Sequence, residues 1–198
     1  MFPIPEASNI TGLILAGGKA RRLNGQDKGL IPLGNQRLVE YAVTRLRPQL
    51  DEILINANRN PDSYRQLGYP IIADTLPDFA GPLAGLLTGL QHMTHDWLVS
   101  VPCDNPWLPA NLVEKLREGI KQQACPLAVA RCDGRLQAVY CLVHRSLQAS
   151  LIDYLGQGQH KVQGWIQQQA HCVVDFADGR EFENINTPEE LAKAEKNL

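Results

Sequence analysis

The chain of 198 residues is 44% hydrophobic and 20% charged, which suits one α/β domain of ordinary size with a substantial buried core. Its formal net charge is only −2. This balance excludes the strongly basic character with which whole domains bind nucleic acid or anionic membranes. Any phosphate-bearing ligand must therefore be held by a local group of cations.

The cysteines and the hydrophobic runs bear on the cellular compartment. There are five cysteines and no C-x-x-C pair, so neither a zinc ribbon nor a disulfide scaffold is expected, and free thiols in a reducing cytoplasm are the simplest interpretation. The N-terminus lacks the basic and apolar regions of a signal peptide, and no apolar run reaches the roughly 20 residues of a membrane span. We predict a flexible leader over residues 1–9 and a single domain over residues 10–198.

Strands and helices are predicted to alternate along the chain. The apolar run 10–15 is typical of a buried strand, and apolar residues at helical spacing predict a helix over 38–46. Asn60-Pro61 resembles an N-cap with proline at the first helical position, and residues 187–190 form a capping box. The other predicted strands are 52–56, 71–73, 97–101, 127–130, 136–143 and 173–176, and the other predicted helices are 83–93, 109–123, 146–155 and 161–168.

This alternation predicts a three-layer, Rossmann-like α/β fold with a mainly parallel central sheet. In such sheets ligands bind beyond the carboxyl ends of the strands. Ala16-Gly17-Gly18 follows the first predicted strand, and Asn56, Asp74 and Asp104 end the next three. We therefore expect three polar side chains and a glycine turn to converge on one edge of the sheet.

The loop after the first strand has the composition of a phosphate site. Paired glycines let backbone N–H groups approach phosphate oxygens closely, while Arg22 and Lys28 add positive charge. The loop is not a Walker A motif, because Gln26 follows Gly25, and it lacks the G-x-G-x-x-G spacing of dinucleotide-binding folds. An ordinary glycine turn with a solvated basic loop is the alternative, but the cations and the convergent acids together favour phosphate binding.

Asp104 is the candidate magnesium ligand. It comes just after an apolar strand, between Pro102 and Pro106, on a turn with little freedom. Mg²⁺ prefers oxygen ligands and uses one or two protein carboxylates together with phosphate oxygens. The alternative is that Asp104 caps the following helix.

Asn56 and Asp74 are candidates for contact with a base or ribose. Their side-chain oxygens suit guanine, which presents the neighbouring donors N1–H and N2 amino, although both residue types also commonly end strands. Gly81 and Gly85 flank the start of a helix, where an anion or a base could bind. Close packing of that helix on the sheet is the alternative.

Asn184 and Asn186 place two amides on one face of an extended segment, where they could contact a second substrate or the ligands around a metal. A turn that only leads into the capped helix is the alternative. On spacing alone, that turn is the preferred interpretation.

The ordered set of these motifs resembles the molybdenum cofactor guanylyltransferase (MobA) family. Each motif alone is short, but together they run in order from residue 10 to residue 191 and form a specific pattern. The matching residues are Leu15-Ala16-Gly17-Gly18, Arg22, Asp27-Lys28, Asn56, Asp74, Gly81-Pro82-Leu83-Ala84-Gly85, Pro102-Cys103-Asp104 and Asn184-Ile185-Asn186-Thr187-Pro188.

The resemblance implies a nucleotidyltransferase fold and a Mg²⁺-dependent transfer of GMP from GTP to Mo-molybdopterin, which yields molybdopterin guanine dinucleotide and pyrophosphate. By position, Lys28, Arg22 and Asp104 would be catalytic, and Asp104 would bind the metal. The implied GTP-binding residues are Leu15, Ala16, Gly17, Gly18, Lys28, Asn56, Asp74 and Asp104. Gly81, Gly85, Asn184 and Asn186 would lie on the base or pterin side.

Two other functions are compatible with the motifs. Within the same enzyme class, a relative could use CTP or a sugar phosphate. From another class, the chain could bind GTP without catalysis and hand over a cofactor. We expect a cytoplasmic monomer with no nucleic-acid or membrane partner, in contact with proteins of molybdenum cofactor synthesis or molybdoenzyme maturation.

Overall fold

A computed structural model describes residues 4–17, 26–76 and 81–197. Its centre is a seven-stranded sheet of order β5-β4-β1-β6-β8-β7-β9, in which β8 runs antiparallel to both neighbours and every other pair is parallel. The prediction of a mainly parallel Rossmann-like sheet is thus confirmed. The strands are β1 Ile10–Leu15, β4 Glu52–Asn56, β5 Ile71–Ile72, β6 Trp97–Pro102, β7 Leu127–Cys132, β8 Arg135–His144 and β9 Cys172–Phe176.

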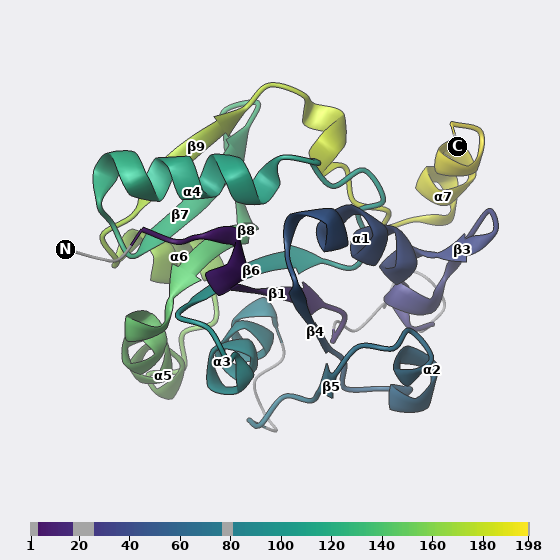
Figure 1. Cartoon of the computed structure of the whole chain (residues 1–198). Coiled ribbons are helices and arrows are strands. Elements are labelled where there is room, and N and C mark those ends of the chain that lie inside the picture. The colour runs from purple at the N-terminus through teal and green to yellow at the C-terminus, as the bar shows by residue number, and fades with distance from the viewer. Residues whose placement is uncertain (1–3, 18–25, 77–80, 198) are drawn as a thin grey trace.

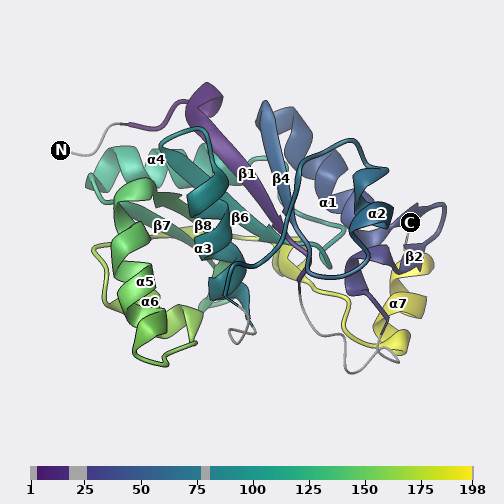
Figure 2. The same ribbon diagram turned by 90° about the horizontal axis from the view of Figure 1, so that it is seen from below.

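Helices cover both faces of the sheet and complete the three layers. Helices α1 and α4 lie on one face, and α3, α5 and α6 lie on the other (Figures 1 and 2). The short α2 and the terminal α7 flank the sheet beside its carboxyl edge. The helices are α1 Leu38–Leu46, α2 Pro61–Arg65, α3 Pro82–His92, α4 Leu112–Gln123, α5 Gln148–Gly156, α6 Val162–Gln167 and α7 Pro188–Glu195.

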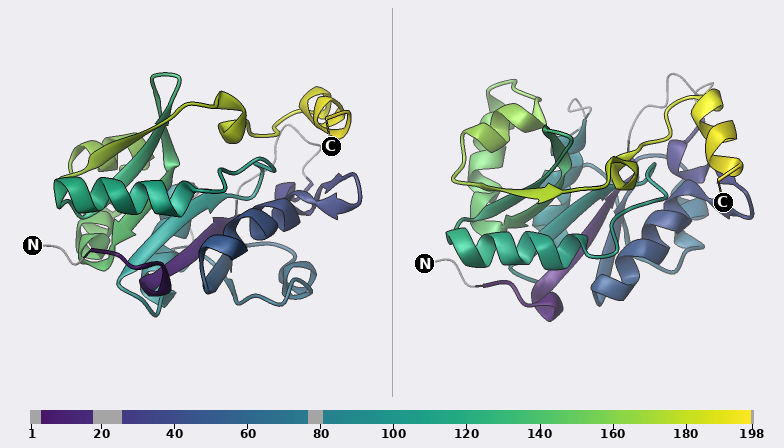
Figure 3. Two further views of the ribbon diagram at one scale, coloured as in Figure 1. Left: turned by 45° about the horizontal axis from the view of Figure 1, so that its top comes forward. Right: turned by 90° about the horizontal axis from the view of Figure 1, so that it is seen from above.

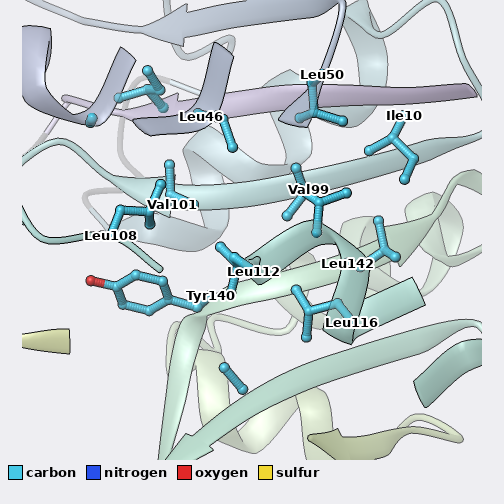
Figure 4. Packing of buried hydrophobic residues seen from close by; sticks show 14 of the residues in the cluster. Ile10, Leu46, Leu50, Val99, Val101, Leu108, Leu112, Leu116, Tyr140 and Leu142 are labelled. Atoms are coloured by element: carbon cyan, nitrogen blue, oxygen red, sulfur yellow. The ribbon is translucent and has the colours of Figure 1, made fainter. Parts of the chain in front are cut away.

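Strand β1 lies inside the sheet, between β4 and β6, and its residues alternate between two apolar faces. Ile10 and Ile14 face the core beneath α1 and α4, and Leu13 faces the core beneath α3. Gly12 lets α1 approach closely, since a Cβ there would lie 2.9 Å from Leu46 Cδ2. Figure 4 shows the first core, in which side chains from β1, α1, α4, β6 and β8 interdigitate.

A third, smaller core holds the C-terminal segment at the ligand edge. The hairpin of β2 Pro32–Leu33 and β3 Gln36–Arg37 lies at the same end of the molecule as α7 (Figure 3). Ile185 and Ala194 pack with Leu33 in this cluster. The chain thus returns from the far strand β9 to the carboxyl edge of β1 and β6.

Two details of the predicted elements are corrected. Helix α4 begins at Leu112 and not at residue 109. Asn60 precedes α2 in the left-handed conformation, with a φ of 48°, but its side chain makes no capping hydrogen bond and donates to Asp27 instead. The Thr187 capping box of α7 is confirmed. Asp133-Gly134 forms the turn between β7 and β8.

The five cysteines are buried and free, in agreement with the sequence. Within the described ranges, no helix has the length and apolar character needed to cross a membrane. Pro5 is buried in the segment before β1, and Arg117 Nε donates to its carbonyl oxygen at 2.6 Å.

Candidate active site

Four neighbouring parallel strands, β5, β4, β1 and β6, bring the predicted residues to one edge of the sheet. The backbone hydrogen bonding of β1 with its two neighbours continues past the end of the strand. Ala16 N donates to the Asn56 carbonyl (2.8 Å), and Cys103 N donates to the Leu15 carbonyl (3.1 Å). The start of the glycine loop therefore lies between the ends of β4 and β6. Gly18 and Arg22 lie outside the described residues.

Lys28 is the charged centre on the β6 side. Its Nζ donates to Asp104 Oδ2 in an ion pair and to Asn186 Oδ1 at 2.7 Å. The two charged side chains are only 20% and 9% exposed. Three predicted residues from distant parts of the chain thus share one mostly buried cluster, in which electrostatic interactions are stronger than in water.

Asp104 does not cap a helix, since α4 begins eight residues later and the Asp104 carboxylate pairs with Lys28. The proposed capping alternative is therefore wrong. The backbone carbonyl of Asp104 accepts a hydrogen bond from Ile185 N at 2.9 Å, which fixes the 184–186 segment against the end of β6. Its Oδ1 is buried and has no hydrogen-bond partner among the described residues.

On the β4 side, Asp74 is held by amides. Asn56 Nδ2 donates to Asp74 Oδ1 (2.8 Å), and Asn58 Nδ2 donates to Asp74 Oδ2 (2.7 Å). Asp74 N donates in turn to Asn58 Oδ1 (2.7 Å). Asn56 is buried and Asn58 is exposed, so this cluster extends from the sheet to the surface.

On the β4 side, a glycine allows helix α3 to lie close to the ends of β1 and β4. A Cβ on Gly85 would lie 2.4 Å from Asn56 Oδ1 and 2.6 Å from Leu15 Cδ2, so α3 can approach the ends of β1 and β4 only with glycine there. Gly81 precedes α3 with a φ of 146°, a conformation that L side chains rarely adopt. Gly85 therefore has the close-packing role, and it lies directly against a predicted base-binding residue.

Comparison with known proteins decides the family. Residues 12–173 match the model of the MobA-like NTP transferase domain. A molybdenum cofactor guanylyltransferase from Cupriavidus pinatubonensis is 45% identical over 188 residues, with 92% of this chain and 94% of the relative covered. The chain belongs to the MobA family.

Further relatives agree. A molybdenum cofactor guanylyltransferase from Haemophilus influenzae is 42% identical, with 93% of this chain and 96% of the relative covered. The crystal structure of molybdopterin-guanine dinucleotide biosynthesis protein A from Archaeoglobus fulgidus matches with a TM-score of 0.76 at 22% identity, covering 94% of this chain and 97% of that one. This structural match shows that the present chain and the Archaeoglobus fulgidus protein have the same fold.

The motif pattern of the MobA family did not reveal what holds Lys28 in place. The preceding residue, Asp27, is 7% exposed, and its carboxylate accepts from Tyr64 Oη (2.5 Å) and from Asn60 Nδ2 (3.2 Å). Burial, with the neighbouring Cys103 and Asp27 adding to it, raises the pKa of Tyr64 well above its usual value. The Tyr64 hydroxyl therefore stays protonated and serves as a donor.

A second unpredicted support lies behind Asn184. The Asn184 side-chain oxygen accepts from Tyr140 Oη (3.2 Å), and Tyr140 Oη accepts from Asn105 Nδ2 (2.7 Å). Asn186 Nδ2 donates to the Asn184 carbonyl (3.2 Å), so this chain of hydrogen bonds reaches the Lys28 cluster. Tyr140 and Asn105 are separated by 35 positions, and no local motif marks such a contact.

The residues around Asp104 fit a divalent cation of the magnesium type. In the part of the chain that the structure describes, no three or more His, Cys, Asp or Glu side chains form a group that could hold a metal ion. Mg²⁺ does not need one, because it usually takes one or two carboxylates and completes its shell with phosphate oxygens and water. The unpartnered Asp104 Oδ1 is a suitable single ligand of this kind.

Proposed function

We propose that this protein transfers GMP from GTP to Mo-molybdopterin, forming molybdopterin guanine dinucleotide. A terminal phosphate oxygen of the acceptor forms a bond to the α-phosphorus of GTP. The bond from that phosphorus to the α,β-bridging oxygen breaks, and pyrophosphate leaves with the electron pair. The proposal extends to this chain what the names of its MobA-family relatives say of those proteins.

The observation that carries the proposal is the Lys28–Asp104–Asn186 cluster beside the glycine loop. Nucleotidyl transfer depends on in-line positioning and charge stabilisation, and it needs no covalent nucleophile from the protein. The Lys28 ammonium has three N–H donors, and the contacts within the described ranges occupy two of them. The third is available to a phosphate oxygen.

The other phosphate contacts are assigned to the loop. The loop that opens with Leu15-Ala16-Gly17-Gly18 would bind the triphosphate through backbone N–H groups beyond Ala16, whose own N–H is held by the Asn56 carbonyl. Arg22 would neutralise the phosphate charge. Asp104 Oδ1 would hold Mg²⁺, which when bound would supply positive charge that stabilises the leaving pyrophosphate. Asn186 would keep the Lys28 ammonium oriented when Asp104 also holds a metal.

We assign the guanine base to the β4 side of the site and the pterin acceptor to the segment beside the end of β6. Asn56 and Asp74 would receive the guanine, since a carboxylate can accept from its N1–H and N2 amino groups together. Gly81 and Gly85 support that side, because Gly85 lets α3 lie against Asn56. Asn184 and Asn186, which reach the Lys28 cluster from the other side, are proposed for the pterin.

The proposed surroundings follow from the same chemistry. The five buried free thiols suit a reducing cytoplasm. The product is a cofactor, so proteins of molybdenum cofactor synthesis and molybdoenzyme maturation are the expected partners of a monomeric enzyme.

The proposal is tested by incubating the protein with each nucleoside triphosphate, Mg²⁺ and Mo-molybdopterin, and measuring pyrophosphate and the dinucleotide product. Only GTP is expected to give both products. Turnover with CTP or with a sugar phosphate acceptor would favour the related transferase instead. GTP that is bound but not consumed in the presence of authentic acceptor would identify a non-catalytic binding protein.

A further inference from the structure

Asn58 connects two parts of the proposed nucleotide site, although none of the motifs considered above includes it. It lies two residues after Asn56, just beyond β4, where the backbone of the strand ends. Its side chain is exposed. A packing role therefore does not explain its contacts.

Those contacts fix the Asp74 carboxylate. Asn58 Nδ2 donates to Asp74 Oδ2 at 2.7 Å, and Asp74 N donates to Asn58 Oδ1 at 2.7 Å. The two hydrogen bonds close a ring that includes both the side chain and the backbone of Asp74. Asn56 Nδ2 holds the other carboxylate oxygen at 2.8 Å. The plane of the carboxylate is thus set by two amides.

Asn58 also lies against the glycine loop. A Cβ on Gly17 would lie 2.7 Å from Asn58 Nδ2 and 3.2 Å from Asn56 Oδ1. The backbone of Gly17 therefore lies directly against both amides. The proposed phosphate loop and the proposed base-binding carboxylate share Asn58 as a common neighbour.

We propose that Asn58 is a positioning residue for Asp74 and thereby sets the preference for guanine over hypoxanthine in the bound nucleotide. This inference rests on the proposed use of GTP. A carboxylate accepts from two neighbouring donors only when its plane is aligned with them, and its oxygens have lone pairs beyond those that the amides occupy. Inosine triphosphate keeps N1–H but lacks the N2 amino donor, so it reports on this alignment.

The test measures equilibrium binding of GTP and of inosine triphosphate to the full-length protein with Mg²⁺ and without acceptor. The variants are Asn58→Ala, the nearly isosteric Asn58→Asp and Asp74→Ala. Asn35→Ala is the matched control, because Asn35 is an exposed amide in the turn between β2 and β3. Melting temperatures of all variants establish that each is folded.

The wild type and Asn35→Ala should prefer GTP to the same degree. In Asn58→Ala, the ratio of the affinity for GTP to that for inosine triphosphate should fall about tenfold, which corresponds to one hydrogen bond of ordinary strength. In Asp74→Ala, the preference for GTP should be lost entirely. Asn58→Asp should bind GTP more weakly than Asn58→Ala, because its carboxylate faces that of Asp74.

A folded Asn58→Ala protein that keeps the wild-type preference overturns the inference, as does a wild type without any preference. The readout needs no acceptor. If GTP is bound selectively but no GMP is transferred, the proposed function fails while the binding ratios still decide the role of Asn58.

Discussion

The carboxyl edge of the sheet differs in chemistry on the two sides of β1. On the β6 side, Lys28 and Asp104 form an ion pair that is mostly removed from water. On the β4 side, Asp74 is partly exposed and receives its hydrogen bonds from neutral amides. Charges act strongly where water is excluded, whereas oriented donors and acceptors discriminate between ligands. We infer that the β6 side stabilises the transition state and the β4 side recognises the base.

The largest effect is expected on the β6 side. Asp104→Ala and Lys28→Ala should each lower the rate of GTP-dependent pyrophosphate release at saturating GTP by roughly 100- to 1,000-fold, because a charged group at the reacting phosphates is lost. Asp175→Ala is the matched control, since Asp175 forms an exposed ion pair with Arg131 far along the sheet in β9. Near-normal turnover of a folded Asp104→Ala protein would contradict the metal assignment.

A change on the β4 side should act mainly on binding. Asp74→Ala is expected to raise the KM for GTP by roughly 10- to 100-fold, the range of one to two hydrogen bonds to a charged group, with kcat reduced far less. Steady-state kinetics over a range of GTP concentrations separates the two parameters. A loss in kcat as large as that of Asp104→Ala would remove the distinction between the two sides.

The contact between α3 and β4 offers a test of stability. Gly85→Ala should destabilise the fold by about 1–3 kcal/mol, because its Cβ would lie 2.4 Å from Asn56 Oδ1. Gly156→Ala is the control in another helix, where an added Cβ meets no atom within 4 Å. Chemical denaturation measures both free energies of unfolding. Equal stability of the two variants would show that α3 does not depend on this close approach.

An effect on stability of similar size is expected at the support of Lys28. Tyr64→Phe should cost about 1.5–3 kcal/mol of unfolding free energy at neutral pH, since the buried Asp27 carboxylate loses a donor. The pKa of Tyr64 is raised in the folded protein, so its contribution is complete below pH 10 and declines as pH rises above that value, where the unfolded chain ionises first.

The difference in stability between wild type and Tyr64→Phe should therefore shrink between about pH 10 and pH 11. Denaturation curves at pH 8, 10 and 11 measure it. A difference that grows with pH would show that Tyr64 ionises more readily in the folded protein than in the unfolded chain.

Much of the fold could be predicted from the sequence because it depends on local patterns. The apolar runs located β1 and β4, and the capping box at Thr187 located α7. The polar residues after the strands were correctly expected at one edge, since parallel strands end on the same side. Asn60 was misread because its side chain has a competing partner, Asp27, that is 33 positions away.

Three unpredicted residues of the site could not be found from local patterns because their contacts are long-range. Tyr64, Tyr140 and Asn105 act through partners that are distant in the sequence. Asn58 is different, because the spacing Asn56-Ala57-Asn58 places two amides on one face of an extended segment. Asn184 and Asn186 have the same spacing, so this pattern also marks Asn58 in the sequence.

The most direct test of nucleotidyl transfer follows the phosphorus atoms of GTP. The wild-type protein is incubated with Mo-molybdopterin, Mg²⁺ and GTP labelled with ³²P at either the α- or the γ-phosphate. Label from the α position should enter the pterin product, and label from the γ position should leave as pyrophosphate. Transfer of the γ label to the acceptor, or its release as inorganic phosphate, would contradict the account.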